Sequence, residues 1–234
     1  MYKRVLVKIS GEMFGCDDGG SFDFAKYDVV AKAIAGFAKS KSVEVGIVVG
    51  AGNVWRFRDT QGSQLPRVVA DQMGMTATVF NAKLLENAFH KLRVKALAIS
   101  DFDVPQLISV YEPSEARRLM DQGNILIFAG GTGNPYFTTD SAAALRALEL
   151  ECDILMKATK VDGVYSADPK KNPNAERYKE LSYDKVLQRN LQVMDLAAIS
   201  LCRDNNLPVL VFDFTDPLNL ARVFSDFKLG TLIS

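Results

Sequence analysis

The sequence has few residues of the kinds that staple a small fold or bind a transition metal. Of its 234 residues, three are cysteine and one, His90, is histidine. Cys16, Cys152 and Cys202 are far apart and form no CxxC pair, which argues against a disulfide framework and against a zinc site. We therefore expect three free, structural thiols. A single histidine also leaves no candidate for a Ser-His-Asp arrangement.

Long hydrophobic runs are also missing. No stretch approaches the roughly 18 apolar residues that a transmembrane helix requires, so we expect no membrane span. The first residues, MYKRVLVKIS, begin a β-strand at once and lack the apolar run and cleavage site of a secretory signal. These absences predict a cytoplasmic protein.

The chain has no excess of charge of either sign, because 28 Lys and Arg residues balance 28 Asp and Glu residues. No net field would draw it to nucleic acid or to an anionic membrane, and no basic stripe is present. Any anion site must therefore be local. Apolar residues make up 48% and charged residues 24%, as in an ordinary soluble protein that is long enough to bury a core.

Strand-like and helix-like segments alternate along the chain. Apolar, β-branched runs predict buried strands at residues 4–10, 43–50, 124–131, 153–159 and 208–214. Helical patterns occupy residues 24–40, 67–92, 113–122, 138–150, 182–190, 195–206 and 217–226. This alternation predicts an α/β fold with a mostly parallel sheet sandwiched by helices, which binds ligands at the carboxyl ends of its strands.

Two loop segments bear on domain organisation. Residues 166–178 are the most turn-rich stretch, and they predict a surface loop joining two halves. A boundary near residue 150 is only weakly indicated, so we expect a single domain over residues 1–234. Residues 15–24 are rich in glycine and aspartate and predict a mobile loop, which either covers a site or is a simple connection.

The first two strands end in residues suited to phosphate. Lys8 supplies a point charge, Ser10 a hydroxyl, and Gly11 lets backbone amides approach a phosphate closely. The alternative is a strand ending in a turn with a solvated lysine. Residues 50–53, Gly-Ala-Gly-Asn, predict a helix N-terminus whose unpaired amides favour an anion, or else a glycine-rich turn needed only for packing. They form neither a P-loop nor a dinucleotide fingerprint.

The third strand is followed by three glycines and an asparagine within residues 130–134, and then by Thr138-Thr139-Asp140. Thr138 or Thr139 is a natural N-cap, and Asp140 falls in the first helical turn, where the helix dipole favours a carboxylate. Capping alone would explain these three residues. It would not require so many glycines, which let the backbone wrap around a flat ligand.

The fourth strand leads into Asp162-Gly163, a pair that predicts a hairpin turn. Thr159, Tyr165 and Asp168 would then border a nucleoside, whereas a plain hairpin with solvated charges would need no ligand. Each strand end is ambiguous alone. Together the four indicate a nucleotide site.

At this point the sequence resembles the bacterial uridylate kinases of the amino-acid-kinase family, over nearly its whole length. The most specific segments are KISGE (8–12), GAGN (50–53) with Arg56, and residues 67–82, 129–143, 155–169 and 193–212. The resemblance implies the amino-acid-kinase fold and transfer of the ATP γ-phosphoryl group to UMP, giving UDP and ADP in pyrimidine nucleotide biosynthesis. It also implies an acceptor half at about residues 1–150 and an ATP-binding half at about residues 151–234.

The same resemblance assigns roles to individual residues. Lys8, Asp140 and Asp195 would be catalytic, and the ribose hydroxyls of UMP would donate to Asp71. The residues implied for ATP are Lys8, Ile9, Ser10, Gly11, Gly52, Arg56, Thr159, Tyr165 and Asp168. Those implied for UMP are Ala51, Asp71, Thr132, Gly133, Asn134, Pro135, Tyr136, Phe137, Thr138 and Thr139.

The resemblance further implies Mg²⁺ bound through the nucleotide phosphates, with no direct side-chain motif for the metal. It implies a homohexamer, with helix 67–92 as an interface or a core helix, and inhibition by UTP. The sequence departs from the family pattern at Ala51, Phe57, Glu86 and residues 21–23. The departures at Ala51 and Phe57 would narrow the acceptor loop, whereas those at residues 21–23 and Glu86 put activation by GTP in doubt.

Two other functions remain open from the sequence. One is a kinase of the same fold that acts on a carboxylate, a carbamate or acetylglutamate. The other is a non-catalytic nucleotide-binding or sensor protein, but such a module would not need Lys8, Asp140 and Asp195.

Overall fold

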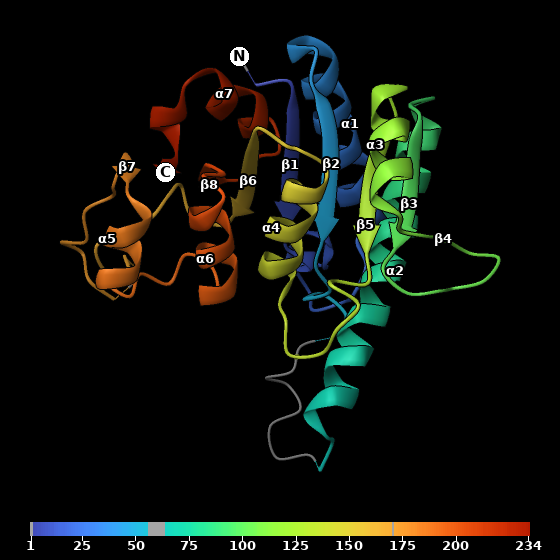
Figure 1. The fold of residues 1–234 in the computed structure, drawn as a ribbon, viewed down its shortest axis with the longest axis horizontal. Coiled ribbons are helices and arrows are strands. Elements are labelled where there is room, and N and C mark those ends of the chain that lie inside the picture. Colours follow the sequence, from blue (N-terminus) through green and yellow to red (C-terminus); the bar gives the residue numbers. More distant parts are fainter. Residues whose placement is uncertain (1, 56–63, 170) are drawn as a thin grey trace.

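The computed structural model describes residues 2–55, 64–169 and 171–234, and the described residues form a nine-stranded sheet (Figure 1). The strands are β1 (Arg4–Ile9), β2 (Glu44–Val49), β3 (Ala96–Ser100), β4 (Ser109–Val110), β5 (Ile125–Ala129), β6 (Ile154–Thr159), β7 (Glu180–Leu181), β8 (Val209–Asp213) and β9 (Thr231–Ile233). The α-helices are α1 (Phe24–Lys41), α2 (Arg67–Lys91), α3 (Pro113–Asp121), α4 (Thr139–Glu149), α5 (Tyr183–Gln188), α6 (Leu196–Asp204) and α7 (Asn219–Ser225), and the short 3₁₀ helices are η1 (Gly11–Phe14) and η3 (Phe227–Leu229).

The predicted α/β class and mostly parallel sheet are confirmed. The strand order is β4-β3-β5-β2-β1-β6-β8-β9-β7, and β8 with β9 is the antiparallel pair of the ladder. All five predicted strands and all seven predicted helices are present, with ends shifted by one or two residues. The sequence reasoning missed β3, β4, β7 and β9, of which β4 and β7 have only two residues each and so show no periodicity.

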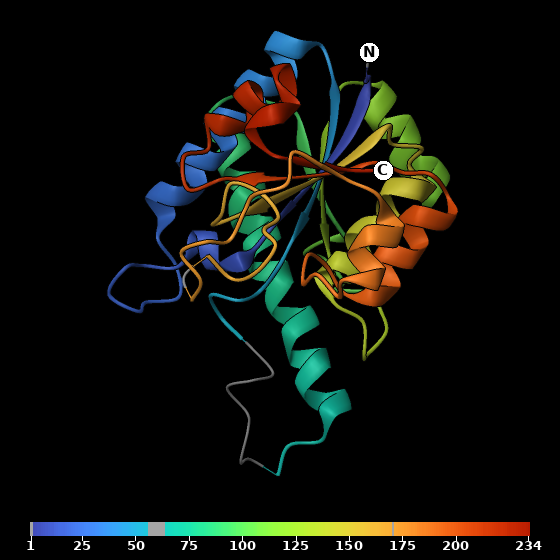
Figure 2. The ribbon, with the colours of Figure 1, turned by 90° about the vertical axis from the view of Figure 1, so that its left-hand side faces the viewer.

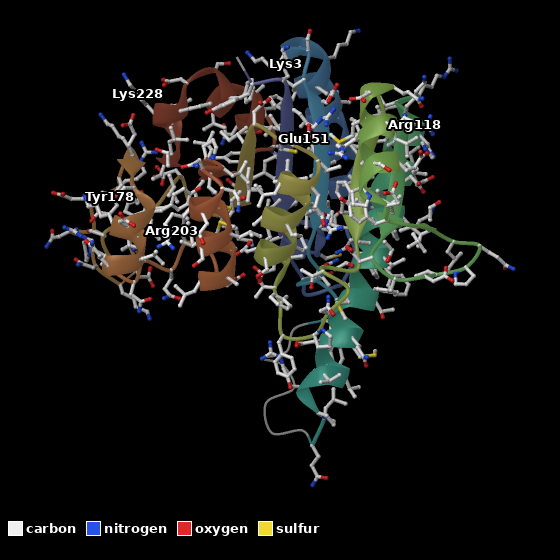
Figure 3. All side chains as sticks on the ribbon, in the orientation of Figure 1. Lys3, Arg118, Glu151, Tyr178, Arg203 and Lys228 are labelled. Carbon is white, nitrogen blue, oxygen red and sulfur yellow. The ribbon has the colours of Figure 1, made fainter. Side chains whose placement is uncertain are left out.

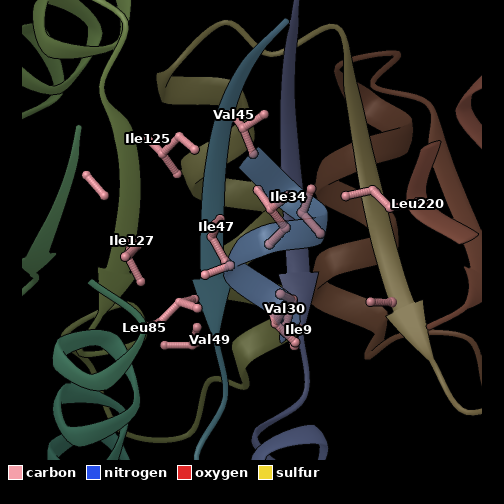
Figure 4. Packing of buried hydrophobic residues seen from close by; sticks show 14 of the residues in the cluster. Ile9, Val30, Ile34, Val45, Ile47, Val49, Leu85, Ile125, Ile127 and Leu220 are labelled. Carbon is pink, nitrogen blue, oxygen red and sulfur yellow. The ribbon is translucent and has the colours of Figure 1, made fainter. Parts of the chain in front are cut away.

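Helices cover both faces of the sheet, because successive strand residues point to opposite faces and are apolar on each. Val5, Val7 and Ile9 of β1 pack with α1, α2 and α7, whereas Leu6 packs with α3, α4 and α6. Figure 2 shows these two helical layers on either side of the sheet. Figure 4 shows the packing on the face that α1, α2 and α7 cover. Each fully buried aliphatic side chain of this kind contributes about 1.5–3 kcal/mol.

The sheet is continuous across residue 150. Strand β1 pairs in parallel with β2 on one side and with β6 on the other. The described residues of 166–178, which exclude residue 170, form a largely exposed loop, as expected, but this segment connects β6 to β7 within the second half of the chain. The expectation that this loop joins two halves is therefore wrong.

The two edges of the sheet differ in character. Lys3 and Glu151 lie beside the amino ends of β1 and β6, at the end of the molecule opposite the loops that follow the strands (Figure 3). The N-terminal turns of α2 extend past the other edge, where the strands end (Figure 1). Among the described helices, none is long and apolar enough to cross a membrane.

Candidate active site

The four strand ends predicted to form one site do lie at one edge. Strands β1, β2, β5 and β6 are mutually parallel neighbours, so their carboxyl ends meet there. A first cavity of about 310 Å³ is lined from the ends of β1 and β2, from α2, and from residues 131–139. A second cavity, of about 510 Å³, is lined from residues 159–169 and 189–193.

The loops after β1 and β2 pack directly on each other. A Cβ added to Gly11 would lie 2.5 Å from the backbone nitrogen of Gly52 and 2.6 Å from the backbone oxygen of Gly50. Gly11 is therefore required for this packing, whatever ligand binds beside it. Residues 52–54 form a turn, in which Val54 N and Trp55 N donate to Ala51 O at 2.8 and 2.9 Å. The helix expected to follow this point falls on residues 56–63, which lie outside the described residues. Arg56 and Phe57 lie outside the described residues.

A buried polar network holds the loop after β2 in place. Asn81 of α2 is fully buried, and its Nδ2 donates to Gly50 O at 2.7 Å and to Asn53 Oδ1 at 2.8 Å. Tyr27 OH donates to Asn81 Oδ1 at 2.6 Å, and the Tyr27 ring stacks on Phe14 at 4.3 Å. Sequence reasoning missed Asn81 and Tyr27, although an asparagine among apolar helix residues was a visible signal.

Two lysines and an aspartate form the charged centre of the site. Lys8 Nζ lies 2.9 Å from Asp140 Oδ1, and Lys157 Nζ lies 2.6 Å from Asp140 Oδ2. Lys157 also donates to the backbone oxygen of Val193. Burial opposes the charge on Asp140, but the two ammonium groups outweigh it and hold the pKa of this carboxyl below its usual value. Burial and the nearby Lys8 lower the pKa of Lys157.

Lys157 was missed as a site residue. Lys8 and Lys157 are register partners across the β1–β6 ladder, so they point to the same face of the sheet. The sequence did carry a signal, because a lysine stands inside the otherwise apolar strand ILMKAT. A buried lysine without a counter-ion would be costly, so a lysine at this position indicates an acidic partner.

Asp195 has a different environment from Asp140. It caps α6 by accepting from Ala198 N at 2.9 Å, and it accepts from the hydroxyls of Thr138 and Ser141. Thr138 in turn is the N-cap of α4, as predicted, and Asp140 lies in the first turn of that helix. Asp195 thus ties the start of α6 to the start of α4.

The loop over residues 130–137, here called the glycine loop, has an unusual backbone. Gly130, Gly131 and Gly133 have φ values of 82°, 64° and 73°, which glycine adopts without strain. Tyr136 also has a positive φ of 73°, and its amide donates to Asp71 Oδ2 at 2.8 Å. Asp71 further accepts from Arg67 Nε at 2.8 and 2.7 Å, so it joins α2 to the glycine loop.

The predicted site residues that the structure describes fall into three groups. Those lining the first cavity are Lys8, Ser10, Gly11, Ala51, Gly52, Asp71, Thr132, Phe137, Thr138 and Thr139. Those lining the second cavity are Thr159, Tyr165 and Asp168. Those lining neither are Gly133, Asn134, Pro135 and Tyr136 of the glycine loop, Asp140 and Asp195 behind the first cavity, and Ile9, whose side chain is in the core.

The expected hairpin at Asp162-Gly163 is wrong. Tyr165 makes an isolated antiparallel bridge with Arg177 rather than with a residue just before the turn. Gly163, at φ 157°, is required because a Cβ there would lie 2.5 Å from Thr231 Oγ1. Thr159 and Tyr165 bond within their own loop, to Val161 O at 2.6 Å and to Asp162 Oδ1 at 2.7 Å.

The donor set suits a magnesium ion carried by a nucleotide better than one held by the protein. The described residues contain no cluster of three or more His, Cys, Asp or Glu side chains. The central carboxylate, Asp140, is already shared between two lysines. Mg²⁺ commonly keeps several waters and binds through substrate phosphates with one or two carboxylates, which this arrangement allows.

Comparison with known proteins agrees with this geometry. A model of the amino acid kinase family matches residues 3–213. The chain belongs to that family. The uridylate kinases of Brucella anthropi and Colwellia psychrerythraea are 45% and 46% identical over 233 residues, which cover 100% of this chain and 97% and 94% of those proteins.

Solved structures give the same result. The UMP kinase from Bacillus anthracis matches with a TM-score of 0.96 and 35% identity, over 100% of this chain and 96% of that one. The UMP kinase from Ureaplasma parvum matches with a TM-score of 0.93 and 37% identity, over 100% and 99%. The resemblance stated from the sequence is confirmed at the level of family and fold.

Proposed function

We propose that the protein is a UMP kinase, which transfers the γ-phosphoryl group of ATP to UMP and gives UDP and ADP. The observation that carries the proposal is the position of the charged centre between two cavities. Lys8 lines the first cavity, and Lys157 contacts Val193, which lines the second. Two anionic ligands, one in each cavity, would meet at these ammonium groups.

The chemistry of this transfer fits the residues present. The phosphate of UMP is already anionic near neutral pH, so no side chain has to deprotonate it. The difficulty is to bring two anions together, which positioned positive charge and backbone amides relieve. Lys8 and Lys157 supply the charge, and Asp140 fixes both ammonium groups in place. Mg²⁺ carried by ATP would neutralise part of the charge of its phosphates.

We assign UMP to the first cavity and the nucleoside of ATP to the second. The first cavity has Asp71 and Arg67 on one wall and the glycine loop on another, which gives both a carboxylate for ribose hydroxyls and a cation for phosphate. The second cavity lies in residues 159–193, so the acceptor and ATP halves of the chain would divide near residue 150. A role in pyrimidine nucleotide biosynthesis, in the cytoplasm, follows from this reaction.

Assembly and regulation are also part of the proposal. Helix α2 exposes Val69, Met73 and Phe80, spaced along one side, and a homohexamer would cover such apolar side chains. UTP would compete as an inhibitor in the first cavity. Glu86 is buried, pairs with Lys83 and accepts from Ala98 N at 2.8 Å. The charge of Glu86 is thus neutralised within the subunit, which supports the doubt about activation by GTP.

A coupled assay of ADP release tests the proposed function. Purified protein is given ATP and Mg²⁺ with UMP, CMP, dUMP or acetylglutamate in turn. We expect turnover with UMP and much slower turnover with the other three. Comparable rates with UMP and CMP would contradict the acceptor assignment, and turnover with acetylglutamate alone would indicate the other kinase class. ATP binding without turnover on any acceptor would indicate a nucleotide sensor.

A further inference from the structure

A second charged network lies behind the glycine loop. Arg146 of α4 is buried, with only 3% of its surface exposed, and its Nη1 lies 3.1 Å from Asp101 Oδ1. Its Nε lies 3.1 Å from Glu149 Oε2, and its guanidinium stacks on the Tyr111 ring at 4.0 Å. Tyr111 OH donates to the same Glu149 oxygen at 2.9 Å. None of these residues lines either cavity.

Burying these charged groups costs desolvation free energy that an apolar cluster of the same size would not cost. Asp101 Oδ2 is buried and accepts no hydrogen bond from the residues that the structure describes. Taking charges out of water costs several kcal/mol for each ion, and apolar replacements of a buried pair are often neutral or stabilising. The pair therefore calls for an explanation other than stability.

The position of Asp101 explains why a buried ion pair lies here, because Asp101 directly contacts the glycine loop. Asp101 N donates to Ala129 O at 3.3 Å. A Cβ on Gly130 would lie 2.9 Å from Asp101 N, and one on Gly133 would lie 3.4 Å from Asp101 Cβ. The next residues of that loop, Gly131 and Thr132, line the first cavity. A small displacement of Asp101 must therefore displace the wall of this cavity.

Arg146 connects Asp101 to the helix that carries Asp140, the carboxylate of the charged centre. It lies six residues after Asp140 on α4, about 9 Å along the helix axis. The ion pair thus fixes the turn after β3, on which the glycine loop rests, to the helix that carries Asp140. No comparable side-chain link joins the second cavity to this network in the described residues.

We infer that Asp101 and Arg146 are positioning residues for the acceptor: their ion pair holds the glycine loop at a fixed distance from Asp140, and so sets where UMP lies. This inference rests on the proposed function. Burial raises the pKa of Asp101 to about 6, with Arg146 lowering and Glu149 raising it. The groups that face Asp101 are thus Arg146 and Glu149 of α4, with Tyr111 beside them. The pair is intact above about pH 6 and is lost as Asp101 takes up a proton below it.

The test compares Asp101→Asn with the wild type in steady-state kinetics and in UMP binding by calorimetry. We expect the KM and the Kd for UMP to rise roughly 2- to 30-fold, the range for changes along such networks, with the KM for ATP unchanged. Asp121→Asn is the matched control, because Asp121 pairs with Arg4 at 2.5 Å at the opposite edge of the sheet. It should leave both constants unchanged.

The pH profile separates positioning from a purely structural role. The phosphate of UMP itself titrates near pH 6, so the ratio of KM values for variant and wild type is the relevant quantity. This ratio should fall toward 1 as the pH drops from 7.5 to 5.5, because the wild type then loses its pair as well. A ratio that stays constant would overturn the inference.

Glu149→Gln keeps the inference testable if Asp101→Asn does not fold, since Glu149 is partly exposed. Removing this negative charge should lower the pKa of Asp101 and move the acid rise in KM for UMP to lower pH. An unmoved rise contradicts the inference. If the wild type neither binds nor phosphorylates UMP, the proposed function itself fails. If the wild type does both and the variants match it, only the inference fails.

Discussion

Replacing Asp140 with asparagine removes the counter-ion of two buried lysines while keeping the shape of the side chain. Lys8 and Lys157 are each only 12% exposed, and Asp140 is 14% exposed. Breaking a buried pair by removing one partner costs about 3–5 kcal/mol. Because Lys8 lines the first cavity, which water can enter, the lower figure applies. About 3 kcal/mol is roughly a 150-fold change in the unfolding equilibrium.

Thermal unfolding at pH 7 measures this loss. For a chain of this size about 1 kcal/mol shifts the midpoint by roughly 2–4 °C, so we expect a decrease of about 6–12 °C. Asp28→Asn is the control, because Asp28 pairs with Lys91 on the surface at 3.0 Å. An exposed pair contributes about 0.5 kcal/mol, which corresponds to roughly 1–2 °C. Equal midpoints for the two variants would refute the role given to Asp140.

The directions of the pKa shifts of Asp140 and Lys157 predict how the stability difference between the wild type and Asp140→Asn depends on pH. The pKa of Asp140 is lowered in the folded protein, so its contribution is present above the unfolded pKa of 3.8 and is lost as the pH falls through the lower, folded value. The deficit of the variant should therefore be constant near neutral pH and shrink only in strong acid. The pKa of Lys157 is also lowered, and loss of its proton at alkaline pH should reduce the deficit again.

Three further predictions concern single residues of the site. Lys8→Ala should lower kcat far more than it raises the KM for UMP, since its charge is needed most as phosphoryl charge redistributes; an unchanged kcat would remove Lys8 from the mechanism. Asp71→Asn should raise the KM for UMP roughly 10- to 150-fold, with ATP saturation unchanged and a reduced preference for UMP over dUMP in parallel assays. Gly11→Ala should weaken the binding of both substrates and lower the unfolding midpoint, because the added Cβ would lie 2.5 Å from Gly52 N. Kinetics and stability equal to those of the wild type would contradict the packing described.

The sequence predicts the parallel sheet and the shared edge of its strands because buried strands have long apolar runs. It does not predict β4 or β7, which depend on pairing with β3 and β9 rather than on a pattern of their own. After Gly50 the chain forms a turn at residues 52–54 that packs against Gly11. A glycine run alone does not distinguish a turn needed for packing from a helix N-terminus.

The candidate site is predicted unevenly for a similar reason. Lys8 and Asp140 stand at visible strand and helix ends, and the structure brings them together. Lys157 completes their cluster only through the register of β1 with β6, which no local pattern reports. Asn81 acts on the loop after β2 from a distance of 31 residues along the chain, so its role requires the tertiary structure.

The register of Lys8 with Lys157 separates two properties of the site that could change independently. The two charges stand on neighbouring central strands, whose spacing of about 4.8 Å is set by the backbone ladder. Asp71, Thr132 and the rest of the proposed acceptor contacts stand on a helix and a loop outside the sheet. Grafting a different glycine loop and α2 N-terminus onto this sheet would therefore alter which phosphate is accepted while leaving the means of transfer in place, so the chain is a natural starting scaffold for redirected kinases.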